Sequence, residues 1–170
     1  TTRYNVDLTG DLKNVSSHLP SPLSKDAGEP LPVKVNVDGS LESFSLTGNV
    51  GQANHFNSRW LLNHKLTLDR AIWTSDSRTL PPLPAQPGVE LNLPPLDGAE
   101  WLALFQKGVG QNVDDAAQFP QLITVRTPSL ALGGQQWNIL SIISQPTATG
   151  TKVDAHGREI NATLMMRDAA

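Results

Sequence analysis

The sequence predicts a mainly β protein, built on one large curved antiparallel sheet with one short amphipathic helix. Three observations favour this fold class. Most of the chain alternates apolar and polar side chains with the period of two that a β-strand requires. Short segments with glycine, asparagine or aspartate, which are typical of turns, separate these runs. A single segment carries apolar residues at helical spacing.

The N-terminal part of the chain is expected to form strands joined by turns. Arg3 to Leu8 and Val33 to Val37 alternate, and a third strand, Glu42 to Val50, follows Asp38-Gly39. An Asp-Gly pair between alternating runs is a strong hairpin signal. Residues 19–30 contain three prolines and are expected to form a loop, because proline cannot continue a central strand or a helix interior.

The clearest strand pair is Phe56 to Leu62 with Leu66 to Trp73, joined by a short polar connector. Strict alternation in the second strand would place Leu66, Leu68 and Ile72 on one face. We therefore expect these three side chains to share the apolar face of the sheet.

One helix is expected from Asp97 to Lys107. Asp97 can cap its N-terminus, with Glu100 at the third helical position, as in a capping box. An apolar stripe with the spacing i, i+3, i+4 consists of Trp101, Leu104 and Phe105.

The segments 74–88 and 109–119 are expected to be loops, the first because it is rich in proline and the second because it is polar. Pro81-x-x-Pro84 in the first loop matches the pattern of SH3-domain ligands, although a rigid connector is the simpler interpretation. Further strands are expected at Val89 to Leu93, Leu122 to Arg126, Leu130 to Leu132, Trp137 to Ser144, Thr151 to Ala155 and Ile160 to Met166.

The sequence leaves open what buries the apolar face of the predicted sheet. About ten strands at about 4.8 Å spacing would form a sheet roughly 48 Å wide. One helix of about 10 Å diameter covers only part of that width. The sheet can close on itself as a barrel or sandwich, or it can stay open as an apolar groove, in which case the exposed surface would mark binding. Both arrangements require the same alternation, so periodicity leaves both possible.

The composition argues against several functions. The 170 residues carry a net charge of -3, and the lysines and arginines form no basic cluster, so we expect no nucleic-acid partner. The chain has no cysteine, and its four histidines lack the spacing of metal ligands. No nucleophile–base pair, phosphate loop or dinucleotide motif is recognisable. We therefore expect no enzyme activity, no metal and no cofactor.

The chain resembles a fragment of a longer protein. It begins at Thr1 without a signal peptide, and no apolar run reaches the roughly 18 residues of a membrane-spanning helix. We interpret residues 1–170 as a single fragment, with any membrane anchor outside it. Cutting such a sheet would expose two edges through which copies can self-associate.

Several blocks, taken in order, resemble the AsmA-like envelope proteins of enterobacteria. Residues 19–29 read LPSPLSKDAGE and resemble a recurring segment of that family, roughly LPxPLxKPAGE, with Asp26 where proline often stands. The similarity extends over essentially the whole chain, and its further blocks are His55 to Trp60, Lys65 to Trp73, Leu80 to Pro84, Val89 to Gly108, Gly134 to Asn138 and Arg158 to Leu164.

The resemblance to this family, part of the TamB/AsmA superfamily, implies the open arrangement. Such proteins are expected to be anchored in the inner membrane and to cross the periplasm as a U-shaped β-groove. The groove would carry phospholipid acyl chains from the inner to the outer membrane and support the outer-membrane barrier. The implied partners are phospholipid and envelope components of both membranes.

On this interpretation the apolar strand residues line a lipid path. The candidates are Val35, Val37, Phe44, Leu46, Trp60, Leu62, Leu66, Leu68, Ile72, Val89, Leu91, Leu93, Leu130, Leu132, Trp137, Ile139, Ile160 and Leu164. The helix stripe would plug or flank the groove. The same residues would form an ordinary core if the chain were instead a closed β-domain, acting as a structural spacer or a protein-interaction module, or an unrelated small-ligand β-barrel.

Overall fold

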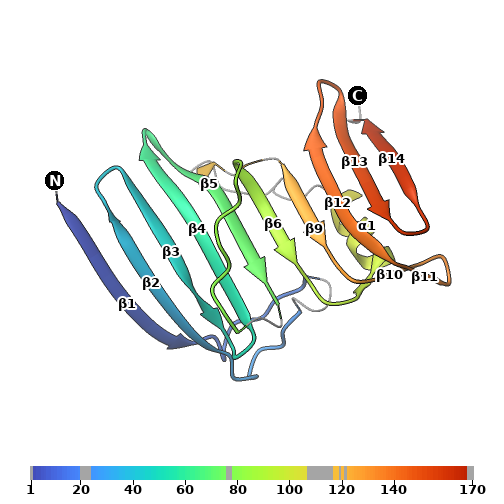
Figure 1. The fold of residues 1–170 in the computed structure, drawn as a ribbon. Coiled ribbons are helices and arrows are strands. Elements are labelled where there is room, and N and C mark those ends of the chain that lie inside the picture. Colours follow the sequence, from blue (N-terminus) through green and yellow to red (C-terminus); the bar gives the residue numbers. More distant parts are fainter. Residues whose placement is uncertain are drawn as a thin grey trace.

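The computed structural model describes residues 2–19, 24–75, 78–106, 117–118, 120 and 122–167. Within these residues the chain forms one 11-stranded sheet, one 3-stranded sheet and one short helix (Figure 1). The mainly β fold expected from the alternation is therefore confirmed.

The large sheet contains strands from both halves of the chain. Its strands are β1 (Arg3–Asp11), β2 (Pro32–Ser40), β3 (Ser43–Val50), β4 (Asn54–Asn63), β5 (Lys65–Thr74), β6 (Gly88–Asn92), β8 (Ala117–Gln118), β9 (Ile123–Arg126), β12 (Ile139–Pro146), β13 (Gly150–Gly157) and β14 (Asn161–Arg167). Their order is β1-β2-β3-β4-β5-β6-β9-β12-β13-β14, and β8 pairs with β5 off this path. Since β1 and β14 do not pair with each other, the sheet is open, and a closed barrel is excluded.

The sheet is mixed, so the expectation of a uniformly antiparallel sheet is wrong in its middle. The strands from β1 to β5 pair antiparallel, as do those from β9 through β12 to β14. In contrast, β6 runs parallel to both β5 and β9, and β8 runs parallel to β5. The physical reason is the length of the connections, because residues 75–87 and 93–122 can return the chain to the end of the sheet from which it came.

A separate three-stranded sheet carries the helix. It consists of β7 (Leu96–Asp97), β10 (Leu130–Leu132) and β11 (Gln135–Trp137), in the order β11-β10-β7. The helix α1 (Gly98–Gln106) follows β7 directly, and the carboxylate of Asp97 accepts a hydrogen bond of 3.0 Å from the Ala99 N–H. This bond satisfies one of the free donors at the helix start, as a capping residue should.

A β-bulge in β5 changes which side chains share a face. Leu68 lies opposite Trp60, but Ile72 lies opposite Asn57, because Asp69 is inserted as an extra residue where the register shifts. One inserted residue reverses the alternation beyond it. The expectation that Ile72 shares a face with Leu68 is therefore wrong, and Ile72 lies on the opposite side of the sheet.

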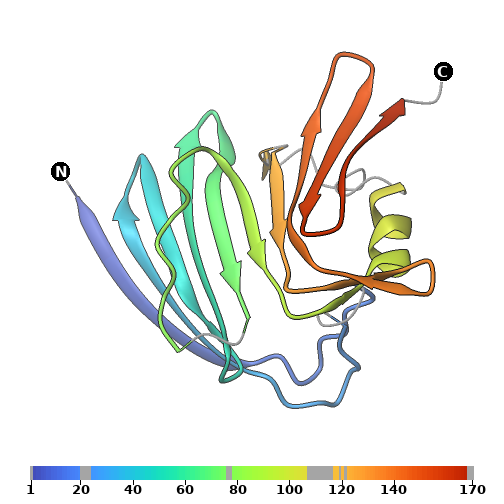
Figure 2. The same ribbon diagram turned by 45° about the vertical axis from the view of Figure 1, so that its right-hand side comes forward.

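The buried core lies between the middle of the large sheet and the small sheet with α1. Figures 1 and 2 show α1 and the small sheet together on one side of the large sheet. The residues of this core cluster are Leu93, Leu96, Trp101, Val125 and Leu130. We call β7, β10, β11, α1 and the segments that connect them to the large sheet the cover.

Candidate functional site

One face of the large sheet, which we call the apolar face, carries two rows of side chains across ten strands. Residues that pair across a ladder point to the same side, so the register defines each row. The first row is Val6, Val37, Leu46, Ser58, Ala71, Val89, Ile123, Ser144, Val153 and Leu164. The second row is Leu8, Val35, Gly48, Phe56, Trp73, Leu91, Val125, Ile142, Ala155 and Ala162. Both rows run across the strands, along the length of the sheet.

Aromatic pairs lie on the same face. Phe44 stacks on Trp60 with ring centroids 6.1 Å apart, and Phe56 stacks on Trp73 at 6.3 Å. The indole N–H of Trp60 donates to the Ser58 hydroxyl at 3.0 Å. Because this bond satisfies the indole N–H within the sheet, the face stays apolar around the ring.

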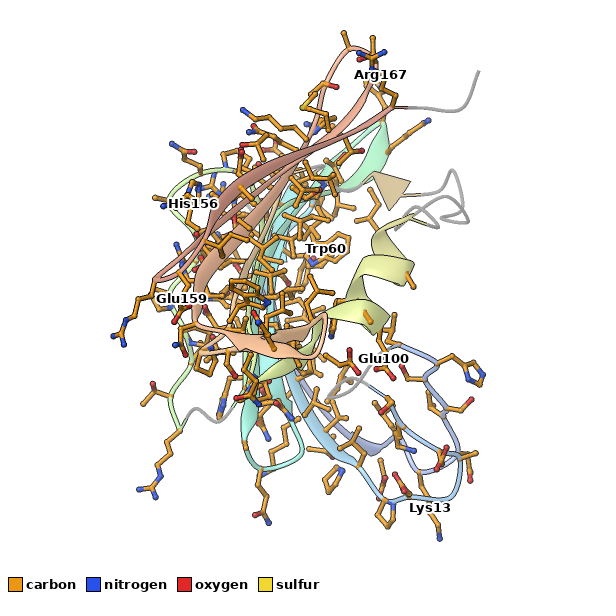
Figure 3. The ribbon with its side chains drawn as sticks, turned by 90° about the vertical axis from the view of Figure 1, so that its right-hand side faces the viewer. Lys13, Trp60, Glu100, His156, Glu159 and Arg167 are labelled. Carbon is orange, nitrogen blue, oxygen red and sulfur yellow. The ribbon has the colours of Figure 1, made fainter. Side chains whose placement is uncertain are left out.

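The opposite face, which we call the polar face, alternates with these rows. One of its rows is Asp7, Asn36, Thr47, Asn57, Ile72, Glu90, Thr124, Ile143, Asp154 and Thr163. Figure 3 shows Trp60 on the side of the sheet that carries α1, and His156 on the other side. The two faces of the sheet therefore differ sharply in polarity.

The proline-rich segment 78–87, between β5 and β6, packs on the middle of the polar face. The Asn57 side chain donates to the Pro81 carbonyl at 3.0 Å, and Arg70 donates to the Pro84 carbonyl at 3.1 Å. Pro81 and Ile72 are buried. Pro81 is buried and Pro84 is half-buried, so this segment packs on the sheet as a connector.

Charged groups on β6, β9 and β13 make ion pairs and hydrogen bonds on the polar face. Arg126 pairs with Glu90, and Asp154 accepts a hydrogen bond of 2.6 Å from the Thr163 hydroxyl. The Thr163 bond, aided by Lys152, holds the pKa of Asp154 below its usual value. Among the described residues, no group of three or more histidines, aspartates or glutamates is placed to hold a metal ion.

The apolar face is covered in its middle and exposed at both ends. Val125 is 2% exposed under the cover, whereas Val6 in β1 and Leu164 in β14 are 43% and 47% exposed. Leu68 is also buried, at 7%. An edge strand has a neighbour on only one side, which contributes to the exposure at the ends.

Two of the connectors between the cover and the large sheet, those that follow β6 and β9, are bonded to each other. The Leu93 N–H donates to the Arg126 carbonyl at 2.9 Å. The buried Thr127 hydroxyl lies 2.9 Å from the Pro94 carbonyl oxygen and 3.0 Å from that of Ser129, so it ties the two connectors together. These hydrogen bonds fix the two connectors side by side at the base of the cover.

The structure places most of the predicted lining residues on the apolar face. These are Val35, Val37, Phe44, Leu46, Trp60, Leu62, Leu66, Leu68, Val89, Leu91 and Leu164. Leu93, Leu130 and Trp137 lie instead in or against the core of the cover. Leu132 is 40% exposed on the small sheet, and Ile160 is half-buried just before β14. The side chains of Ile139, Leu104 and Phe105 lie outside the described residues, and so do residues 107–116 and 119. Within the expected loop 109–119, Ala117–Gln118 form β8, so the expectation of a loop is wrong at these two residues.

Further residues of the apolar face were not among the predicted lining. They include Val6, Leu8, Phe56, Trp73, Ile123, Val125, Ile142 and Val153. Each lies two residues from a named candidate or in an alternating strand, so the period of two was a sufficient signal for most of them.

Comparison with known proteins assigns the chain to a family. The family described as YhdP protein matches residues 1–170. The chain is 72% identical over 167 residues to the intermembrane phospholipid transporter YhdP of Escherichia coli K12, covering 98% of this chain and 13% of that relative. No solved structure matches the chain significantly. No helix among the described residues is long and apolar enough to cross a membrane. The chain therefore belongs to the YhdP family.

Proposed function

We propose that this chain is one segment of a periplasmic, bridge-like lipid-transfer protein. Its apolar face would carry phospholipid acyl chains from the inner to the outer membrane. The observation that carries the proposal is the pair of apolar rows, which continue across ten strands of an open sheet. The relative that the chain matches is described as an intermembrane phospholipid transporter, and the chain spans 13% of its length.

The dimensions of the rows suit a path better than a single pocket. From the axis of the first strand to that of the tenth there are nine spacings of about 4.8 Å, or about 43 Å. An acyl chain spans about 15 Å, half of a bilayer core of about 30 Å. One lipid would therefore occupy only part of the rows and could move to similar neighbouring positions.

The energetics require no specific polar contact along the rows. Burying one CH₂ group contributes about 0.8 kcal/mol, so valine, leucine and isoleucine side chains can hold an acyl chain by area alone. Similar shallow positions favour movement, because no single position binds much more tightly than the next. The polar face would remain in water.

The location follows from the same proposal. We expect the segment to lie in the periplasm, in a protein whose inner-membrane anchor is outside residues 1–170. Its partners would be phospholipid and envelope components at both membranes, and its loss would weaken the outer-membrane barrier.

Site-specific photo-crosslinking in the full-length protein in cells tests the proposal. A photoreactive residue at Leu46 or Leu164 faces the uncovered parts of the apolar rows, and one at Thr47 or Thr163 faces the opposite side of the same strands. We expect phospholipid adducts at Leu46 and Leu164 and few at the two controls. Equal adduct yields on both faces would favour a structural spacer or a protein-interaction module instead.

A further inference from the structure

A hollow of about 370 Å³ lies at one margin of the apolar face. Its apolar wall includes Leu31, Val50 and Trp73, and its polar lining includes Lys25 and Glu29. Trp73 belongs to the second apolar row, between Phe56 and Leu91, so the hollow borders that row near its middle. In Figure 3 the loop between β1 and β2, marked by Lys13, projects on the same side of the sheet as α1.

The polar wall of the hollow is held in place by Lys25. Its ammonium group donates to three backbone carbonyls, those of Val15 at 2.7 Å, Asp26 at 3.0 Å and Lys13 at 3.3 Å. The backbone of Lys25 also pairs with Ser17, the N–H of each donating to the carbonyl of the other. The hydrogens of the ammonium are thus used within the loop, while its positive charge stays beside the hollow.

Negative charge and hydrogen-bond donors complete the lining. Glu29 is exposed and makes no ion pair with the described residues. The Trp73 indole N–H donates to the Ser75 hydroxyl at 3.3 Å, which leaves the hydroxyl hydrogen of Ser75 free to donate to a ligand oxygen. Asn54 adds a side-chain amide to the lining.

We propose that this hollow binds the headgroup of a zwitterionic phospholipid. This proposal rests on the proposed lipid-transfer function. The two apolar rows contain no ionisable side chain, so they offer nothing to a headgroup. The hollow places one positive and one negative side chain, Lys25 and Glu29, beside the apolar row at Trp73. A phosphate accepts hydrogen bonds from Ser75 and Asn54 near the charge of Lys25, and a ligand ammonium faces Glu29. The volume lies within the usual range of small-ligand sites.

The test identifies the lipids that reach the hollow in the full-length protein. A photoreactive residue at Ala53, which lines the hollow, is compared with one at Leu46 on the open row, and the adducts are sorted by headgroup class. We expect the ratio of ammonium-bearing to purely anionic phospholipid to be higher at Ala53 than at Leu46. Glu29→Lys should lower that ratio at Ala53 about fivefold, which corresponds to the loss of one exposed charge pair.

Glu42→Lys is the matched control, because Glu42 is also an exposed glutamate but lies outside the residues that line the hollow. It should leave the ratio at Ala53 unchanged. An equal effect of both variants, or no enrichment at Ala53, would overturn the headgroup site. If Leu46 gives lipid adducts and Ala53 does not, only this site fails. If neither Leu46 nor Leu164 gives adducts, the proposed function itself fails.

Discussion

In β1 the apolar-face residues Val6 and Leu8 are 43% and 55% exposed, whereas Val125 in β9 is 2% exposed. The two regions share the same rows and the same kind of side chain, but only the second has the cover over it. The alternation of side chains therefore determines which face of the sheet is apolar, but not whether that face is buried in a core or exposed. The covered middle is a packed core, and the ends present the surface that the proposed lipid path requires.

Substituting an arginine in each region should give the largest difference in unfolding free energy between them. Val125→Arg buries a guanidinium with no partner and should cost about 4 kcal/mol or more of unfolding free energy. Leu46→Arg lies in the half-buried β3, where the arginine can reach water, and should cost about 1 kcal/mol. Chemical denaturation of residues 1–170 measures both, and similar losses would contradict the division into two regions.

The same pair of variants separates stability from transport. Leu46→Arg should hinder lipid passage in the full-length protein while the sheet stays folded. Leu68 is a poor site for this experiment, because it is buried and its substitution by arginine would disturb folding as well.

The next largest effect on stability is expected from removing the Trp101 side chain, which packs the cover against the large sheet. Trp101→Ala deletes a buried ring from the core cluster and should cost about 3 to 5 kcal/mol. Leu132→Ala, on the exposed surface of the same small sheet, should change stability by less than about 1 kcal/mol. Thermal unfolding followed by tryptophan fluorescence and circular dichroism compares the two. A small effect of Trp101→Ala would mean that the cover contributes little to the fold.

A smaller effect is expected from filling a glycine on the open part of the apolar face. A Cβ at Gly48 would overlap the Lys34 carbonyl oxygen and lie 3.0 Å from the Val35 Cα, so Gly48→Ala should cost about 1 to 3 kcal/mol. At Gly10 nothing lies within 4 Å of an added Cβ, so Gly10→Ala should be nearly neutral. Equal denaturation midpoints for the two variants would show that β2 and β3 tolerate a wider spacing.

The smallest effect on stability is expected from Glu159, which is bonded to Asn138 between β11 and β12. The Glu159 carboxylate accepts hydrogen bonds from the Asn138 side-chain amide at 2.9 Å and the Asn138 backbone N–H at 3.0 Å. These bonds hold the pKa of Glu159 below its usual value. Because the Glu159 pKa is lower in the folded state, the carboxylate stabilises the fold at pH values above its unfolded-state pKa. This contribution is lost as the pH falls through the folded-state pKa.

An NMR titration of the Glu159 carboxyl group checks this assignment. Asn138→Ala should raise the Glu159 pKa part of the way, because the backbone N–H donor remains. An unchanged pKa in this variant would show that the side-chain amide is not the main cause.

The sequence predicted the strands well where a single short turn joins them. The pairs Val33 to Val37 with Glu42 to Val50, and Phe56 to Leu62 with Leu66 to Trp73, correspond to β2–β3 and β4–β5, because a short connector permits only antiparallel pairing. The parallel pairs around β6 could not be read in this way. Their partners depend on where residues 75–87 and 93–122 return the chain.

The candidate site was predictable up to the first irregularity in a strand. Val37, Leu46 and Trp60 lie on the apolar face as their alternation requires. Ile72 does not, because the bulge at Asp69 reverses the alternation, and an inserted residue has no signature in the period of two.

By itself the sequence determined that this chain forms strands with one apolar and one polar side, since side-chain direction in a strand depends only on local backbone geometry. Only the tertiary structure decided that the sheet stays open, that α1 and the small sheet cover its middle, and that Leu93 and Leu130 lie in a core. These outcomes depend on contacts between segments far apart in the chain. Periodicity within one strand carries no information about such contacts.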